Sequence, residues 1–129
     1  MAEAGQPEQA GRSLEGIHRE LAVPCRRRWC RVLGWPRDWR PGTVVDPHDA
    51  DQQVFTEAGA WEFIAELLEA GHPIQEIELD NPAGKRGYVL VADGGDQRPE
   101  IYVKLQLGSG QVIGRSFHYS NKGYERDSR

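Results

Sequence analysis

Near the end of the chain, polar side chains alternate with apolar ones in a pattern that gathers chemically active groups on one face of a predicted hairpin. The segments EIYVKLQL, residues 100–107, and QVIGRSFH, residues 111–118, have the alternation of β-strands, and GSG joins them. Alternate residues of a strand share a face. One face of the hairpin therefore carries a phenol, an ammonium, an amide, a hydroxyl and an imidazole, from Tyr102, Lys104, Gln106, Ser116 and His118.

A three-residue GSG loop would fix the pairing of these strands. Leu107 then faces Gln111, which places Lys104 across from Gly114. By the same register, Tyr102 lies across from Ser116. The second face is apolar, and we expect it to form the core: Ile101, Val103, Leu105, Leu107, Ile113 and Phe117.

Arg115 is the exception on this predicted core face. It falls opposite Val103, where a buried charge is unfavourable. Either its side chain reaches over the sheet edge, or Gly114 marks a bulge that turns Arg115 toward the polar face.

The residue types on the polar face fit RNA cleavage without a metal ion. In that reaction the 2′-hydroxyl loses a proton as it attacks phosphorus, the 5′-oxygen gains one, and the phosphoryl oxygens take up charge. His118 can move a proton near neutral pH, and Lys104 and Arg115 can hold the phosphate. Tyr102 can stack on a base or assist proton transfer. The alternative is an ordinary polar sheet face with a single histidine at a strand end.

The preceding residues predict the elements that position this hairpin. Thr56 can cap a helix whose apolar stripe runs from Ala60 to Leu68, and Gly71 ends it. Two more strands are predicted at 74–79 and 87–92, and short turn-rich links imply antiparallel neighbours. The predicted fold class is α+β, with one main helix packed on an antiparallel β-meander of about four strands.

The first fifty residues read as an irregular or helical extension. Residues 1–13 have the composition of a disordered tail, and residues 14–23 can form a short helix. The next stretch, CRRRWCRVLGWPRDWRPG, mixes six arginines with three tryptophans. Such a mixture can bind single-stranded nucleic acid. We favour a second interpretation, in which the tryptophans pack on the sheet while the arginines stay in water. A third interpretation is a loosely ordered extension.

The net charge of −4 conceals a strong segregation along the chain. Residues 1–45 carry eight Lys/Arg and five Asp/Glu, residues 46–82 carry none and ten, and residues 83–129 carry eight and five. An anionic ligand therefore fits one face of the molecule only. Within the acidic stretch, DPHDAD at 46–51 lacks the Gly and Glu of a calcium-binding loop and reads as a solvated turn.

Cysteine content and hydropathy limit the classes of protein and the cofactors that the sequence allows. Cys25 and Cys30 are the two cysteines, which excludes a disulfide framework, and His18 is the one other ligand near them for zinc. We therefore expect neither a metal nor a cofactor. The sequence has a polar N-terminus, and it contains no apolar run long enough for a membrane helix. We therefore expect a cytoplasmic protein without a membrane partner.

The segment EIYVKLQLGSGQVIGRSFHYS resembles the toxins of bacterial type II toxin–antitoxin systems, and looks most like the MqsR group of the RelE-like endoribonucleases. In those proteins a strand of aromatic, hydrophobic and Lys residues precedes a turn and a strand that ends in Ser-Phe-Lys or Ser-Phe-His. The resemblance covers about residues 55–120. It implies that Tyr102 and Lys104 are site residues and that Lys85 lies near an upstream catalytic lysine. The matching residues are Tyr102, Val103, Lys104, Ser116, Phe117 and His118.

We therefore expect a toxin-like, metal-independent endoribonuclease, or mRNA interferase, with a RelE/MqsR-like domain at 51–120, an extension at 1–50 and a basic tail at 121–129. Its expected partners are RNA and a cognate antitoxin. The alternatives are a non-catalytic module that binds nucleic acid or protein, and a small accessory or immunity-type protein whose acidic helix neutralises a basic partner. The expected catalytic residues are His118, Tyr102, Lys104 and Arg115, and the expected RNA-binding residues are Lys85, Arg86, Ser116 and Tyr119.

Overall fold

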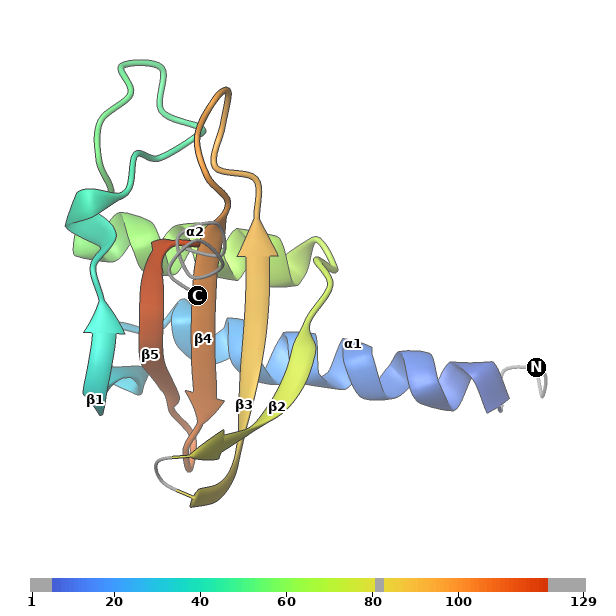
Figure 1. Ribbon diagram of the computed structural model, residues 1–129. Coiled ribbons are helices and arrows are strands. Elements are labelled where there is room, and N and C mark those ends of the chain that lie inside the picture. Colours follow the sequence, from blue (N-terminus) through green and yellow to red (C-terminus); the bar gives the residue numbers. More distant parts are fainter. Residues whose placement is uncertain (1–5, 81–82, 121–129) are drawn as a thin grey trace, which may run out of the picture.

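Five strands form one mixed sheet in the computed structural model, which describes residues 6–80 and 83–120 (Figure 1). The spatial order of the strands is β1-β5-β4-β3-β2. β2 to β5 pair antiparallel in chain order, and β1 adds a parallel strand beside β5 that the sequence does not predict, so the sheet is mixed and larger than the predicted four-stranded meander. The predicted tail at 121–129 lies outside the described residues. The strands are β1 (Arg31–Trp39), β2 (Gln75–Asp80), β3 (Ala83–Ala92), β4 (Ile101–Leu107) and β5 (Val112–Tyr119).

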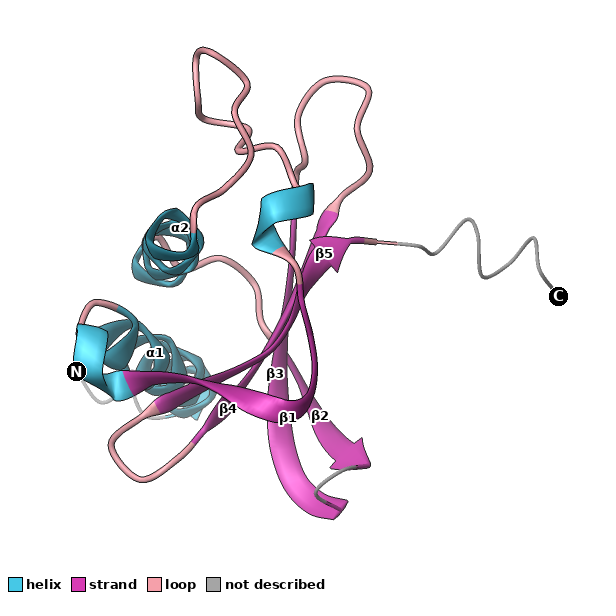
Figure 2. Cartoon of the chain, turned by 90° about the vertical axis from the view of Figure 1, so that its left-hand side faces the viewer, coloured by secondary structure: helices cyan, strands magenta, loops and turns pink. Residues whose placement is uncertain are grey.

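Two α-helices of the described chain lie on one side of the sheet, α1 (Gln6–Cys25) and α2 (Glu57–Glu69) (Figure 2). The α+β class is confirmed, although the helical layer holds two helices where the sequence predicts one main helix. α1 begins at Gln6, inside the segment predicted to be disordered, and it includes Pro24 in its last turn. Neither helix is long and apolar enough to cross a membrane.

α2 begins and ends where the sequence predicts. The hydroxyl of Thr56 accepts a hydrogen bond from the backbone N–H of Gly59 at 2.9 Å, which satisfies one of the free donors of the first turn. Gly71 follows the helix with a φ of 81°, a conformation that favours glycine. The buried face of α2 supplies six side chains to the core: Ala60, Trp61, Phe63, Ile64, Ala65 and Leu68.

The hydrophobic core includes residues from well before α2. Leu21 of α1 and Val44 are both fully buried. Trp39 of β1 packs against Trp61 and Phe117, with ring centroids 4.9 and 5.5 Å away. For Trp39, the favoured interpretation of the tryptophans is therefore confirmed. The packed unit extends back through residues that the sequence assigns to an extension.

The hairpin of β4 and β5 begins in a different register from the predicted one. Leu107 pairs with Val112 and not with Gln111. A shift of one residue exchanges the two faces of a strand. Ile113 consequently pairs with Gln106 on the side away from the helices, and the prediction that Ile113 joins the core is wrong.

A bulge at Arg115 then shifts the register a second time. Lys104 pairs with Ser116 and Tyr102 with His118, so the predicted pairs of Lys104 and Tyr102 are wrong by two residues. Because two single shifts restore the original alternation, Ser116 and His118 still lie on the same face as Tyr102 and Lys104. The bulge is one of the two arrangements that the sequence leaves open for Arg115.

Candidate active site on the open face of the sheet

The face of the sheet that points away from the helices carries a row of paired residues that crosses all five strands. Paired residues of antiparallel neighbours have Cβ atoms about 4.5–5.5 Å apart on the same face. The row therefore brings an ammonium, a hydroxyl and a carboxylate close together. From β2 to β1 its members are Gln75, Val89, Lys104, Ser116 and Asp38.

A second row lies beside the first and consists of Val91, Tyr102 and His118. The two rows line a hollow of about 550 Å³ in the open face. The hollow is lined by four of the five polar side chains that the hairpin pattern assigns to one face, all except Gln106: Tyr102, Lys104, Ser116 and His118.

The ring of His118 is held at both nitrogens. Nδ1 lies 2.8 Å from the backbone oxygen of Tyr119, and Nε2 lies 3.2 Å from Oδ2 of Asp38. The backbone oxygen of Tyr119 is an acceptor, so Nδ1 donates this hydrogen bond when it carries the ring proton. Nε2 and the Asp38 carboxylate form an ion pair when the imidazole is protonated. The side chain of His118 remains 20% exposed and is reachable from the hollow.

Asp38 stands between an imidazole and a guanidinium. Its Oδ2 faces His118, and its Oδ1 lies 2.8 Å from Nε of Arg40. Oδ1 accepts no directed hydrogen bond from the described residues, so the contact with Arg40 is electrostatic. The Arg40 side chain is 65% exposed, and such a pair contributes little to stability. Lys104 lines the same hollow, so the site combines two permanent cations, Lys104 and Arg40, with a single carboxylate, and a protonated His118 adds a third positive charge.

Tyr102 fixes the orientation of the imidazole from the neighbouring strand. The two rings stack with centroids 5.3 Å apart and planes inclined by 28°. Ser116 is buried at the floor of the hollow, where it pairs with Lys104. The site is thus a shallow, polar depression with an aromatic edge.

Arg115 does not line the hollow, although it was expected to hold the phosphate there. The bulge turns its side chain toward Gln106, whose Oε1 accepts a hydrogen bond from Nη1 at 3.3 Å. β1 covers the guanidinium, because a Cβ added at Gly34 would lie 2.7 Å from the same nitrogen. Arg115 is 8% exposed, so its charge reaches a ligand in the hollow only through the surrounding protein.

The remaining predicted RNA-binding residues also lie away from the hollow. Lys85 and Arg86 are exposed near the start of β3, where Arg86 forms an ion pair with Glu76. Tyr119 pairs with Ile101 on the helix-covered face. Its hydroxyl accepts a hydrogen bond from the backbone N–H of Val45 at 3.0 Å.

The acidic cluster at 46–51 forms a turn. Asp46 accepts a hydrogen bond from the backbone of His48, and Asp49 accepts two, from Asp51 and Gln53. Among the side chains that the structure describes, no three from His, Cys, Asp or Glu are grouped so that they could hold a metal ion.

Asp38 and Arg40 are the site residues that sequence reasoning misses. Asp38 lies near the end of β1, and Arg40 directly follows the strand. Both belong to the segment that the sequence assigns to an N-terminal extension. The signal that could find them is a fifth strand in RVLGWPRDW, because a strand beside β5 would bring its last residues next to His118.

Comparison with known proteins adds no family to these observations. No protein-family model matches the chain, and no curated protein or solved structure matches it. The interpretation of the site therefore rests on its own geometry.

Proposed function

We propose that this chain is a metal-independent endoribonuclease whose active site is the hollow on the open face of the sheet. The observation that carries the proposal is the contact between His118 and Asp38 beside Lys104. RNA cleavage by the 2′-hydroxyl requires a base, an acid and a cation near the phosphoryl oxygens. The three side chains can supply these three functions.

Asp38 and His118 take the roles of base and acid. The scissile phosphodiester enters between them and replaces their direct 3.2 Å contact. Asp38 accepts the proton of the 2′-hydroxyl, whose oxygen forms a bond to phosphorus. The bond from phosphorus to the 5′-oxygen breaks, and His118 gives its Nε2 proton to that oxygen. The products are a 2′,3′-cyclic phosphate and a free 5′-hydroxyl.

The other groups of the hollow bind and orient the RNA. The ammonium of Lys104 stabilises the charge that develops on the phosphoryl oxygens, and Arg40 adds a guanidinium beside Asp38. Tyr102 offers an aromatic surface for one base. Because the cations outnumber the carboxylate, the hollow attracts an anionic substrate even though the whole chain has a net charge of −4.

The proposal extends to a toxin of the type II class, as the resemblance of the hairpin implies. A cognate antitoxin would then cover the hollow or add a strand to an exposed sheet edge. β1 and β2 are the edge strands of the sheet, and the free backbone groups of an edge favour such pairing.

The direct test is incubation of the purified protein with a long unstructured RNA in EDTA. We expect fragments that end in 2′,3′-cyclic phosphate. His118→Ala and Asp38→Asn should each lower the cleavage rate about a hundredfold or more, because each removes one proton-transfer group. RNA with 2′-O-methyl groups should bind and stay intact, since it lacks the attacking hydroxyl.

Lys85→Ala is the matched control for Lys104→Ala. Both lysines lie on the meander, but Lys85 is outside the hollow and should be replaceable without loss of cleavage. A mock purification from cells that lack the protein reveals any contaminating ribonuclease. Cleavage that persists in His118→Ala would contradict the proposal. So would intact RNA both with and without ribosomes, a result that would favour a non-catalytic binding module.

A further inference from the structure

A second surface of the molecule combines arginines with an exposed tryptophan. The short helix η2 (Arg28–Cys30) links α1 to β1, and Trp29 at its centre is 82% exposed. The guanidinium of Arg28 lies over the indole, 5.4 Å from the ring centroid. Trp39 and Trp61 pack against each other, so Trp29 differs from them in presenting its ring to solvent.

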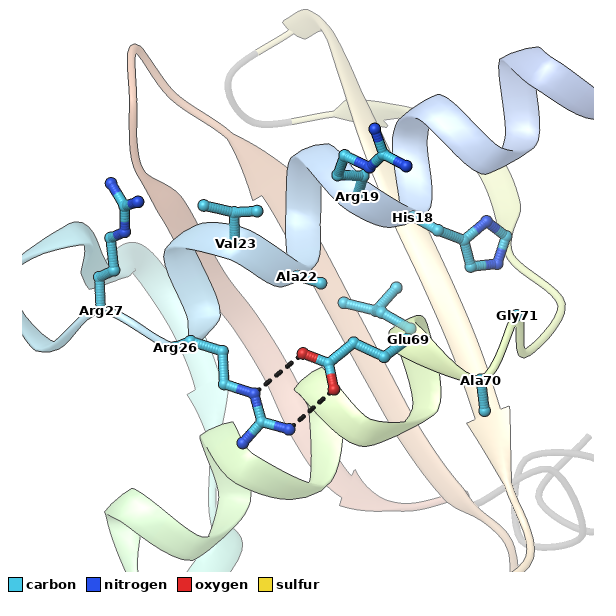
Figure 3. Close-up of a pocket in the computed structure, with 10 residues that line it drawn as sticks. His18, Arg19, Ala22, Val23, Arg26, Arg27, Glu69, Ala70 and Gly71 are labelled. Atoms are coloured by element: carbon cyan, nitrogen blue, oxygen red, sulfur yellow. Dashed lines mark hydrogen bonds and ion pairs between the residues drawn. The ribbon is translucent and has the colours of Figure 1, made fainter.

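Two further arginines extend this surface, Arg19 of α1 and Arg27 directly before η2. Figure 3 shows Arg26 turned toward Glu69 of α2, while Arg19 and Arg27 point away from that helix. Arg26 donates two hydrogen bonds to Glu69, at 2.9 and 2.8 Å, and they lower the pKa of the Glu69 carboxyl. Arg26 is therefore used in the contact between the helices. The side chains of Arg19 and Arg27 form no hydrogen bond or ion pair with another described residue.

Arg19 and Arg27 border two grooves that share the exposed side chain of Val23. One groove, of about 830 Å³, lies between α1 and α2 (Figure 3). The other, of about 420 Å³, lies between α1 and the turn that joins β4 to β5. This second groove reaches Cys30, the neighbour of Trp29 in η2, and Glu20 is the carboxylate in its lining. An extended chain in these grooves would thus pass Arg19 and Arg27 and reach η2, the short helix that carries Trp29.

We infer that Arg19, Arg27, Arg28 and Trp29, here called the α1–η2 surface, bind a single-stranded stretch of nucleic acid. Guanidinium groups fit phosphate oxygens in a bidentate way, and an indole stacks on a base of any sequence. An acidic peptide would also match the arginines, but it would give the flat indole no stacking partner. The identification of the strand as RNA rests on the proposed function, whereas binding itself requires no cleavage.

The test uses the full-length His118→Ala protein and a short fluorescein-labelled 2′-O-methyl oligouridylate, so that the strand stays intact. Trp29→Ala should weaken binding about fivefold or more, because a stacked base is lost. The change in tryptophan fluorescence on binding should disappear with it. Replacing Arg27 and Arg28 by Ala should reduce the slope of log affinity against log salt by about 0.7 for each arginine. Val54→Ala, at an exposed apolar residue outside this surface, is the matched control and should bind normally.

Two outcomes would overturn the inference. Unchanged affinity in the Trp29 and arginine variants, with weaker binding by Lys104→Ala, would place all binding in the hollow. Displacement of the oligonucleotide by polyglutamate as effectively as by unlabelled RNA would identify an acidic protein as the partner. The two proposals fail separately: a protein that binds through Trp29 but cuts no RNA contradicts only the proposed function, and one that cuts RNA but binds equally well without Trp29 contradicts only this inference.

Discussion

The two faces of the sheet are made by alternate residues of the same strands, but they differ in kind. On the face under α1 and α2, Val103, Leu105 and Phe117 are completely buried. On the open face, His118 and Lys104 line a polar hollow. A step of one residue therefore leads from the core to the proposed active site. The comparison teaches that substitutions on the two faces should separate loss of stability from loss of RNA cleavage.

The neighbours Phe117 and His118 give the largest contrast. Phe117→Ala should lower the free energy of unfolding by about 3–5 kcal/mol, because it leaves a cavity in the core. His118→Ala should change it by less than about 1 kcal/mol, since its ring lies outside the core and pairs with the half-exposed Asp38. Urea unfolding of both variants measures this difference. Equal destabilisation by the two substitutions would show that the faces are not independent.

Gly114 sharpens the comparison, because it lies where β5 passes under Trp39. A Cβ at Gly114 would lie 2.6 Å from Cζ3 of the indole. Gly114→Ala should therefore lower the free energy of unfolding by about 1–3 kcal/mol through overpacking. Gly42→Ala is the matched control, since a Cβ there has no neighbour within 4 Å. Thermal melts that are the same for both variants would contradict the packing that the structure gives to Trp39.

The helix-covered face should also respond to alkaline pH. Burial raises the pKa of the Cys25 thiol from 9.0 to about 12. The unfolded chain then loses this proton first, so the contribution of Cys25 to stability is intact below about pH 9 and is lost as the pH approaches 12. Urea midpoints measured across this range should fall less steeply for Cys25→Ala. The buried Tyr88, whose pKa is also raised by burial, will keep part of the dependence. Parallel curves for wild type and variant would exclude the assigned role of Cys25.

Lys104→Ala should have the smallest effect on stability. Its side chain lies on the open face, and we expect a change in the free energy of unfolding within about 0.5 kcal/mol. The same variant should cleave RNA much more slowly, because the phosphoryl oxygens lose their ammonium partner. Urea unfolding and cleavage measured on one preparation test both statements. A large loss of stability would mean that the hollow contributes to folding.

The meander and α2 are predictable because their signals are local. Thr56 caps the helix from three residues away, and the alternation of each strand is contained in fewer than ten residues. β1 gives no such signal. It contains Gly34 and Pro36, both unfavourable inside a strand, and its pairing with β5 is interrupted between Leu33 and Asp38. Its conformation is fixed by a partner far away in the sequence.

The candidate site was likewise predictable only where its signals are local in the sequence. Alternation alone brings Tyr102, Lys104, Ser116 and His118 to one face, and the structure places all four in the hollow. The exact partners were not predictable, because the turn and the bulge at Arg115 each shift the pairing by one residue. Asp38 could not be predicted without β1, since its place beside His118 follows from the parallel strand.

The ribosome makes β1 early, but β5, the strand that β1 pairs with, is the last of the meander. During synthesis of the residues between them, β1 must wait for its partner, and contacts so distant in sequence form late in folding. Asp38 and His118 therefore meet only after β5 has emerged. A nascent chain, or a fragment, that stops before β5 lacks the pair of Asp38 and His118, so the proposed nuclease would stay inactive until β5 has emerged and paired with β1.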